Sequence, residues 1–575
     1  MDQKFWYECN SIKNLQNDAN LMKNTKIADL IEQNSNSGQF DAQFNDIYFD
    51  FCRQKINTSV LNHLFEFADE RNVVKKIRDM FEGEIVNITE KRAALHTLLR
   101  YPYTQNNIKN YTQNDIKNYT QNQQNIYKKQ QNNIQNVHSV LNQIQLFSQQ
   151  IRQGEFCGYF GDKFEYIICV GIGGSFLATQ FVFEALLANQ NAYKLSNNFN
   201  LMFLSNVDPI NFTQITQKVN PKKTLVIIIS KTFTTAETML NAQLMKEWLI
   251  EQLGNSDVIE KHMIAVSTNS DLVQNFGINL KNMFGFWDWV GGRFSVTSAV
   301  GILPLSIVFG FDFINQFLNG CYDMDMHFLN TSINKNIPIL MALISFWNSS
   351  FFNLNAVAIL PYCQALHKFC GHIQQLIMES NGKCTSTFGG ILDKKTSEIY
   401  FGEPGTNGQH SFYQLIHQGQ VIQTEFIGFI VPPLQISAKN SEITAHDELM
   451  CNFFAQPDAL AFGKTAETCL AEGIADWLVP HCMFTGNRPS SILLLPELSP
   501  YYLGCLLSLY EHRTVTQAFI WGINPFDQYG VQLGKVAAGE VRKYLENTKG
   551  NSVTKKNVKP FCSSTQKLLN TYLKY

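Results

Sequence analysis

The sequence predicts an α/β protein with two sugar-isomerase-type lobes, each an α/β/α sandwich around a sheet with a parallel core. From about residue 164, short β-branched or apolar segments alternate with turns and helical patterns, an order typical of βαβ units. A similar but less regular alternation follows residue 310. A chain of 575 residues, 45% hydrophobic, can fill two such cores. We therefore expect a first, phosphate-binding lobe at 136–310 and a second lobe at 311–550.

The regions outside the two lobes have simpler patterns. Residues 1–102 carry amphipathic helical patterns, such as 73–81 and 92–99, and predict a helical N-terminal region. Residues 551–575 form a C-terminal extension, which we expect to be helical. Neither region has a motif that indicates chemistry.

The tract at 103–135 is rich in Asn and Gln. The segment Tyr-Thr-Gln-Asn-Asn-Ile-Lys-Asn begins at Tyr103, is repeated nearly intact from Tyr111 and starts again at Tyr119. With so few core-forming residues, the tract cannot offset the entropy of ordering and predicts a mobile low-complexity insertion. A role as an interaction segment is the alternative, but an insertion that loops into solvent is the simpler interpretation.

The buried parallel sheets account for the apolar segments of the two lobes. A parallel sheet covered on both faces has strands with nearly continuous apolar sequence, separated by helices such as 176–187 and 237–249. The candidate strands are 166–170, 201–204, 225–229 and 263–266 in the first lobe, and 356–360, 426–430 and 491–495 in the second.

Composition and charge exclude several classes of protein. The 46 Lys and Arg nearly balance the 48 Asp and Glu, so no global field favours nucleic acid or an anionic membrane. The longest apolar run, at 299–311, is interrupted by Pro304 and is short for a bilayer, and the N-terminus lacks the pattern of a signal or transit peptide. The 13 cysteines are scattered and predict reduced thiols. We expect a cytoplasmic protein with no membrane or nucleic-acid partner.

Two turns that follow strands of the first lobe favour phosphate binding. At 171–175 (Gly-Ile-Gly-Gly-Ser), small residues let backbone N–H groups approach an anion, although Phe176 replaces the last glycine of the dinucleotide fingerprint. At 230–235 (Ser-Lys-Thr-Phe-Thr-Thr), four hydroxyls and a lysine precede a helix. Each turn alone could be ordinary helix capping. Together, at the carboxyl ends of strands, they indicate a phosphate site. Its candidate residues are Gly174, Ser175, Ser230, Lys231, Thr232, Phe233, Thr234 and Thr235.

Four charged groups lie in or beside glycine-containing loops. Arg293 follows Gly291 and Gly292, Glu379 ends a long helical pattern, His410 lies in the loop 402–410, and Lys535 follows a glycine turn. Each alone would most often be a surface or ion-paired residue. Together they supply one base, two proton donors and one fixed cation, a set that can move protons on a phosphorylated carbonyl compound.

No metal or cofactor is expected from the residue pattern. The one cluster with metal-binding residue types, Cys363, His367, Cys370 and His372, has spacings that do not place the four side chains on one helix face. An aldose–ketose conversion by metal-assisted hydride shift would need clustered carboxylate or histidine ligands, and the sequence offers none.

The motifs resemble those of the phosphoglucose isomerase family. The matching segments appear in the family's order between about residues 85 and 545: 173–175, 230–235, 289–295 (Trp-Val-Gly-Gly-Arg-Phe-Ser), 378–383 (Met-Glu-Ser-Asn-Gly-Lys), 402–410, 486–489 and 528–535. Two departures occur, since Gln375-Leu-Ile stands where the family often has Gln-Gly-Asp, and Gln532 where Glu is common. Neither removes a chemical group that the reaction needs.

The resemblance implies a specific reaction and assigns roles to residues. It implies interconversion of glucose 6-phosphate and fructose 6-phosphate, with His410 and Lys535 opening the ring and Glu379 carrying a proton between C2 and C1. Arg293 would stabilise the enediolate. Gly292, Gln375 and Gln528 would contact substrate. It further implies a homodimer whose active sites are shared between subunits. The alternative is a phosphosugar-binding regulator, which would have no use for these four charged groups together.

Overall fold

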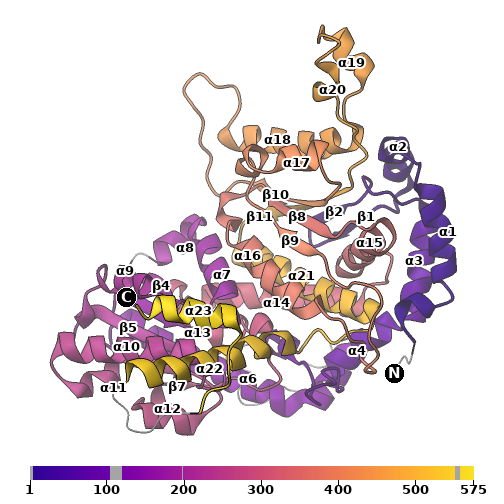
Figure 1. Cartoon of the computed structure of the whole chain (residues 1–575). Helices are drawn as coiled ribbons and strands as arrows, with labels where there is room; N and C mark the ends of the chain where they lie inside the picture. Colours follow the sequence, from indigo (N-terminus) through magenta and orange to yellow (C-terminus); the bar gives the residue numbers. More distant parts are fainter. Residues whose placement is uncertain (1–3, 104–119, 197, 551–556, 575) are drawn as a thin grey trace. The chain divides into compact units, whose positions relative to one another are not determined.

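The computed structural model describes residues 4–103, 120–196, 198–550 and 557–574 (Figure 1). The chain divides into two compact units, Met1–Phe526 and Asp527–Tyr575. The smaller unit contains helix α22 (Gln532–Lys549) and helix α23 (Ser563–Tyr572). The larger unit contains two sheets and every strand named below.

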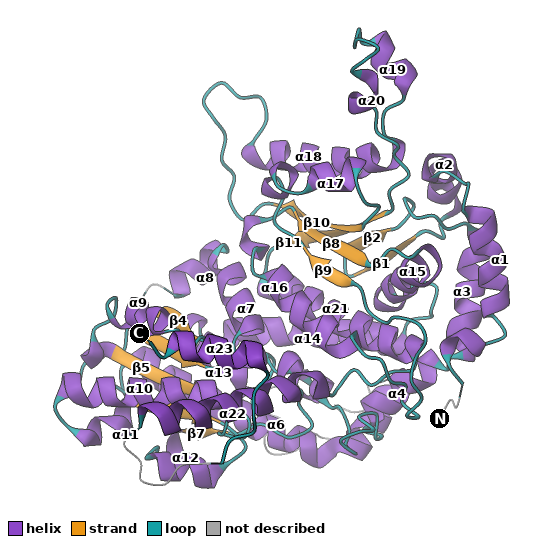
Figure 2. Ribbon diagram, in the orientation of Figure 1, coloured by secondary structure: helices purple, strands orange, loops and turns teal. Residues whose placement is uncertain are grey.

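The first sheet has five parallel strands in the order β4-β3-β5-β6-β7. Alternate residues of the central strands face two different cores. Ile167 and Leu225 lie in the main core of the protein, whereas Ile168 and Val226 lie in a separate core with α10 and α11. Helices therefore cover both faces, as the alternating pattern predicted (Figure 2). The strands are β3 (Tyr166–Val170), β4 (Asn200–Leu204), β5 (Thr224–Ile229), β6 (Met263–Val266) and β7 (Met283–Phe284).

The helices around this sheet alternate with its strands along the chain. They are α7 (Leu177–Leu187), α8 (Gln190–Leu195), α9 (Pro209–Thr216), α10 (Ala236–Leu253), α11 (Ile259–His262), α12 (Ser270–Phe276) and α13 (Ala299–Phe309). Among the described residues, one helical stretch, Gly292–Phe309, is long and apolar enough to cross a membrane, and 94% of it is buried inside the protein. It is longer than the apolar run that the sequence indicated, because a helical turn precedes α13. In this fold it is a core helix.

The second sheet has six strands in the order β1-β2-β11-β10-β8-β9 (Figure 2). Strands β9, β8, β10 and β11 run parallel to one another, whereas β2 pairs antiparallel with β11 and with β1. The strands are β1 (Asp41–Phe44), β2 (Ile47–Asp50), β8 (Ala356–Pro361), β9 (Ile399–Phe401), β10 (Gln423–Val431) and β11 (Ser490–Glu497).

Helices cover both faces of the second sheet as well. Figure 2 shows α17 and α18 on one face and α15, α16 and α21 on the other. The helices of this part are α14 (Phe311–Asn330), α15 (Ile337–Phe352), α16 (Phe369–Ile373), α17 (Tyr413–Gln418), α18 (Ala445–Phe462), α19 (Ala466–Ala471), α20 (Val479–Cys482) and α21 (Pro500–Trp521). The predicted α/β class with two parallel-core sheets is confirmed.

The N-terminal region is not wholly helical, which corrects the sequence prediction. Its helices are α1 (Ile12–Met22), α2 (Ile27–Ser37), α3 (Thr58–Glu70) and α4 (Val73–Glu82). Between α2 and α3, however, β1 and β2 form a hairpin. Asn45 and Asp46 both have positive φ, as a two-residue hairpin turn requires. Ile47 and Phe49 are buried while Tyr48 is exposed, so the alternation of a half-buried strand was present but short.

The Asn/Gln-rich tract also differs from its prediction. Residues 104–119 lie outside the described residues, but residues 121–135 belong to a helix. Thr120 caps helix α6 (Gln121–Gln153), and Ile126, Tyr127 and Ile134 are buried against the main core. A few apolar residues at helical spacing are enough, because one face of the helix alone needs to be apolar. The mobile insertion predicted at 103–135 is therefore wrong for its second half, while 104–119 lies outside the described residues.

Candidate active site

Two glycine turns meet at the first sheet. The first turn is Gly173–Ser175 and the second is Gly292–Phe294. A Cβ added to Gly174 would overlap the backbone of Gly292 and lie 2.8 Å from the nitrogen of Arg293, so only glycine permits this approach. Ser295 fastens the two turns, because its Oγ donates to the carbonyl of Gly292 at 2.6 Å and lies 3.3 Å from that of Gly174. The predicted phosphate turn and Arg293 are thus adjacent.

A buried ion pair joins Arg293 to Glu379. The Arg293 side chain is 1% exposed and that of Glu379 is 25% exposed, and Nη1 donates to Oε1 at 2.8 Å. The remaining donors of the guanidinium are also used: Nε donates to Ser380 Oγ at 2.6 Å, and Nη2 donates to the carbonyl of Pro525. The guanidinium therefore has a fixed orientation, while the carboxylate remains accessible.

Glu379 lies at the end of a short π-helical segment, Gln374–Glu379. Such segments are rare and often occur at functional sites. Gln375 donates from Nε2 to Glu379 Oε2 at 3.1 Å, and its own Oε1 is buried without a hydrogen-bond partner among the described residues. A Cβ on Gly173 would lie 3.2 Å from the same Nε2. Gln375 therefore lies between the glycine turn and the carboxylate.

The hydroxyl-rich turn at 230–235 follows β5 and ends at the N-terminus of α10. The Ser230 Oγ is buried and has no hydrogen-bond partner in the described part of the chain. Thr235 is the N-cap residue of α10, but its side chain caps no backbone N–H. Thr232 and Thr234 share a hydrogen bond of 2.6 Å between their hydroxyls. Phe233 adopts a φ of 56° and is buried. The turn thus presents uncommitted donors at a helix N-terminus.

The Lys231 side chain lies elsewhere than the sequence suggested. Its Nζ donates to the carbonyls of Asp288 at 2.7 Å and Val290 at 3.1 Å, just before the turn that carries Arg293. Burial, with a smaller contribution from the nearby Arg92, lowers the pKa of Lys231 to about 8. Backbone carbonyls of a loop with little regular structure attract the ammonium, and that of Asp288 also accepts from Arg92 Nη1 at 2.9 Å. Lys231 therefore ties the two turns together.

His410 lies at the end of a helical turn, Asn407–His410, and is exposed. The loop that carries it is held by Gln409, whose Nε2 donates to the Tyr362 hydroxyl at 2.9 Å, and by Gly405, which packs against the Tyr362 ring. No hydrogen bond or ion pair joins the His410 side chain to another described residue. The described contacts therefore do not link His410 directly to Glu379.

Lys535 and Gln528 belong to the smaller unit. Lys535 lies in α22 and is exposed, and Gln528 precedes the helical turn Tyr529–Val531. The structure describes this unit by itself, so these two residues are not placed relative to Glu379. Residues that the sequence reasoning missed are Ser380, Lys383, Asn524 and Pro525. The first two lie in the quoted motif at 378–383, whereas nothing local marked the other two.

The described residues contain no group of three or more His, Cys, Asp or Glu side chains that could hold a metal ion. His367 forms an ion pair with Glu184 at 2.6 Å, and His372 is buried in a parallel stack on Phe181. The structure therefore gives the two histidines of the 363–372 cluster separate environments.

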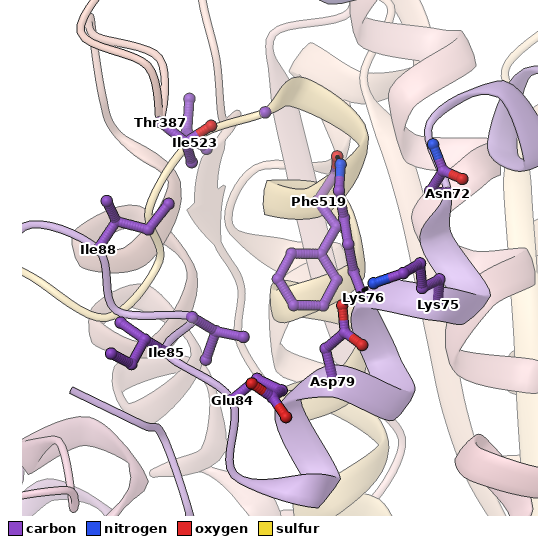
Figure 3. A pocket seen from close by; sticks show the side chains of 12 residues that line it. Asn72, Lys75, Lys76, Asp79, Glu84, Ile85, Ile88, Thr387, Phe519 and Ile523 are labelled. Carbon is purple, nitrogen blue, oxygen red and sulfur yellow. Dashed lines mark hydrogen bonds and ion pairs between the residues drawn. The ribbon is translucent and has the colours of Figure 1, made fainter. Parts of the chain in front are cut away.

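A cavity of about 400 Å³ lies between α4 and the end of α21 (Figure 3). Phe519 and Ile523 form an apolar wall, and Lys75, Lys76 and Asp79 of α4 lie opposite them. Neither Arg293 nor Glu379 lines it. Its wall at Gly522 and Ile523 leads directly into the turn whose Pro525 carbonyl holds Arg293.

The fold and the site together are those of a sugar-phosphate isomerase. They combine parallel-core α/β sheets with a hydroxyl-rich turn at a helix N-terminus and an Arg–Glu ion pair. The family model described as phosphoglucose isomerase matches residues 50–569, and the chain belongs to this family. It is 47% identical over 561 residues to "Glucose-6-phosphate isomerase, cytosolic B" of Oryza sativa subsp. japonica, covering 98% of this chain and 95% of that protein. It is 46% identical to the cytosolic glucose-6-phosphate isomerase of Arabidopsis thaliana, covering 98% and 96%.

A solved structure supports the same family assignment. The glucose-6-phosphate isomerase of Chlamydia trachomatis superposes with a TM-score of 0.80 at 28% identity, covering 99% of this chain and all of that one. The likeness thus extends over both sheets, and the family resemblance read from the motifs is confirmed.

Proposed function

We propose that this chain interconverts D-glucose 6-phosphate and D-fructose 6-phosphate as an intramolecular oxidoreductase. The observation that carries the proposal is the Arg293–Glu379 pair beside two phosphate-type turns. A carboxylate that is partly exposed can reach a substrate carbon, and a buried guanidinium next to it can stabilise an anion. Membership of the phosphoglucose isomerase family supports the same substrate pair.

In this proposal, Glu379 removes the proton from C2 of the open-chain sugar and returns it at C1. The intermediate is a cis-enediolate, whose negative charge the Arg293 guanidinium stabilises. Three fixed contacts hold that guanidinium before substrate arrives, so it needs little reorganisation during the reaction. Gln375 orients the carboxylate from the other side and has a free acceptor for a sugar hydroxyl.

The phosphate of the substrate binds at the turn 230–235. The hydroxyls of Ser230 and Thr235 have no hydrogen-bond partner among the described residues, and α10 adds its N-terminal N–H groups. Thr232 and Thr234 add exposed hydroxyls, and Lys231 and Phe233 contribute backbone N–H groups. Ser175 with Gly174 and Gly292 completes the wall toward Arg293. Binding at this remote group holds the reacting carbons in place.

Ring opening requires proton exchange with the ring oxygen and the C1 hydroxyl, and we assign it to His410 and Lys535. Gln528, at the start of the motif 528–535 that ends with Lys535, would contact the substrate. An exposed imidazole on a well-held loop is suited to act on a neighbouring subunit. We therefore propose a homodimer in which His410 completes the partner's site.

The location and metal requirement follow from the same proposal. Relatives whose names include "cytosolic" support a cytoplasmic enzyme. Proton transfer by Glu379 needs no cofactor or metal. We expect turnover to survive prolonged dialysis against EDTA, and loss of activity that a divalent ion restores would contradict this.

The direct test is Glu379→Gln, which keeps the side-chain shape and removes the base. We expect a normal fold, retained binding of fructose 6-phosphate and a fall in kcat of at least about 1,000-fold. The matched control is Glu448→Gln, because Glu448 is exposed on α18 and should leave kcat unchanged. A coupled assay with fructose 6-phosphate measures turnover, and loss of deuterium from C2 to solvent separates proton transfer from hydride transfer. Near-normal turnover in Glu379→Gln would refute the assignment.

A further inference from the structure

Lys383 connects the segment that carries Glu379 to a distant turn of the chain. Its Nζ donates to three backbone carbonyls: Glu379 at 3.2 Å, Ser380 at 3.0 Å and Asn524 at 3.0 Å. The first two carbonyls belong to the end of a helical segment, where backbone acceptors lack intrahelical partners. A single ammonium therefore satisfies acceptors on two segments that are more than a hundred residues apart.

The turn at 524–526 is itself rigid. Asn524 is buried, and its Nδ2 donates to Asn87 Oδ1 at 2.9 Å and to Thr89 Oγ1 at 2.8 Å. Its Oδ1 accepts from the backbone nitrogen of Phe526 at 3.1 Å. The side chain of Asn524 thus fixes the direction of the next carbonyl, that of Pro525, which accepts a hydrogen bond from Arg293 Nη2.

These contacts close a ring. It runs from Arg293 to the Glu379 carboxylate, through the Glu379 carbonyl to Lys383, across to the carbonyl of Asn524, and by way of Pro525 back to Arg293. We call these five residues the Lys383 ring. Because each member is held by the next, the position of the guanidinium relative to the carboxylate depends on Lys383.

We propose that Lys383 is a positioning residue for the Glu379–Arg293 pair, with Asn524 as its counterpart on the opposite segment. The inference rests on the proposed function, since it concerns the reactive geometry of that site. Lys383 acts through other residues, because its ammonium is directed to backbone carbonyls. Removing it leaves those acceptors unpaired and releases the end of the segment that carries Glu379.

The Lys231 side chain links the phosphate turn to the loop before Arg293, but the turn also has contacts of its own that do not depend on Lys383. The carbonyl of Lys231, within the phosphate turn, accepts hydrogen bonds from Ser267 and Thr268. Neither residue contacts the Lys383 ring. Loss of Lys383 should therefore change kcat while leaving substrate binding largely intact, whereas a general loss of structure would change both.

The experiment compares Lys383→Met with Lys395→Met. Both remove an ammonium, but Lys395 is exposed and hydrogen-bonds to no described residue of the ring. For Lys383→Met we expect kcat to fall by about 10–100-fold, the effect of a misplacement of about 1 Å, with KM for fructose 6-phosphate changed by less than about threefold. Lys383→Arg keeps the positive charge and several donors, so we expect it to recover part of kcat.

Asn524→Ala tests the same ring from its other side and also serves if Lys383→Met does not fold. We expect a similar fall in kcat. A double variant should lose less than the product of the two single losses, because both changes loosen the same 524–526 turn through different contacts. A folded Lys383→Met or Asn524→Ala variant with kcat within about twofold of wild type would overturn the inference, as would multiplicative losses in the double variant. Failure of the proposed function would show instead as near-normal turnover in Glu379→Gln.

Discussion

Adding one methyl group to Gly174 tests whether the two glycine turns hold Arg293 in place. In Gly174→Ala, the new Cβ would lie 2.8 Å from the nitrogen of Arg293, whereas ordinary contact begins at 3.4 Å, so the turns must separate by about 0.6 Å (3.4 − 2.8) or more. The overlap with the Gly292 backbone is larger still, and backbone cannot rotate away as a flexible side chain can.

The expected fall in kcat follows from the hydrogen bonds that Arg293 loses. The guanidinium contacts Ser380, Glu379 and Pro525 on segments that do not move with the glycine turn, so the displacement weakens all three hydrogen bonds. A shift of this size next to the reacting atoms can reduce kcat by about 100-fold. Overpacking should also lower the free energy of unfolding by about 1–3 kcal/mol.

The assay is steady-state conversion of fructose 6-phosphate, coupled to oxidation of the glucose 6-phosphate formed, together with thermal unfolding. Gly285→Ala is the matched control, because a Cβ there meets nothing within 4 Å. It should keep wild-type kcat. A folded Gly174→Ala variant with kcat within about twofold of wild type would refute the idea that the turn contact fixes Arg293.

Three further predictions concern stability, the tract and the dimer. Burial lowers the pKa of His372 to about 4, so below pH 6.5 the unfolded chain binds a proton that the folded imidazole excludes. His372 alone should therefore lower the free energy of unfolding by about 3 kcal/mol from pH 6.5 to 4, in addition to the effect of other buried histidines such as His327. In urea titrations, His372→Phe should reduce the pH-dependent loss by that amount, whereas exposed His481→Phe should not change it. Replacing 104–119 with a short Gly/Ser linker should leave kcat unchanged, and an inactive variant would contradict this prediction. Deleting 104–135 should instead unfold the protein, because it removes the buried Ile126 of α6. Mixing His410→Ala with Glu379→Gln subunits should restore turnover if His410 acts across a dimer, and mixtures as inactive as either parent would show that it acts within one chain.

Much of the fold could be predicted from the sequence, because strands and helices depend mainly on the pattern of neighbouring residues. Each candidate strand lies on an observed strand, since buried parallel strands need continuous apolar sequence. The β1–β2 hairpin was missed because strands of four residues carry too little periodicity to outweigh the helical patterns around them. Helix α6 was missed at its start because its polar face dominates the composition there.

By itself, the sequence determined the α/β class, the position of both phosphate-type turns and the motif that contains Glu379, because each depends on neighbouring residues. The tertiary structure alone decided that Gly174 lies against Gly292, that the Lys231 ammonium binds loop carbonyls, and that Pro525 and Lys383 hold the Arg293–Glu379 pair. These contacts join segments far apart in the chain. Their geometry depends on how the glycine turns, the π-helical end and the 524–526 turn pack together, and no local pattern of residues encodes such a distance.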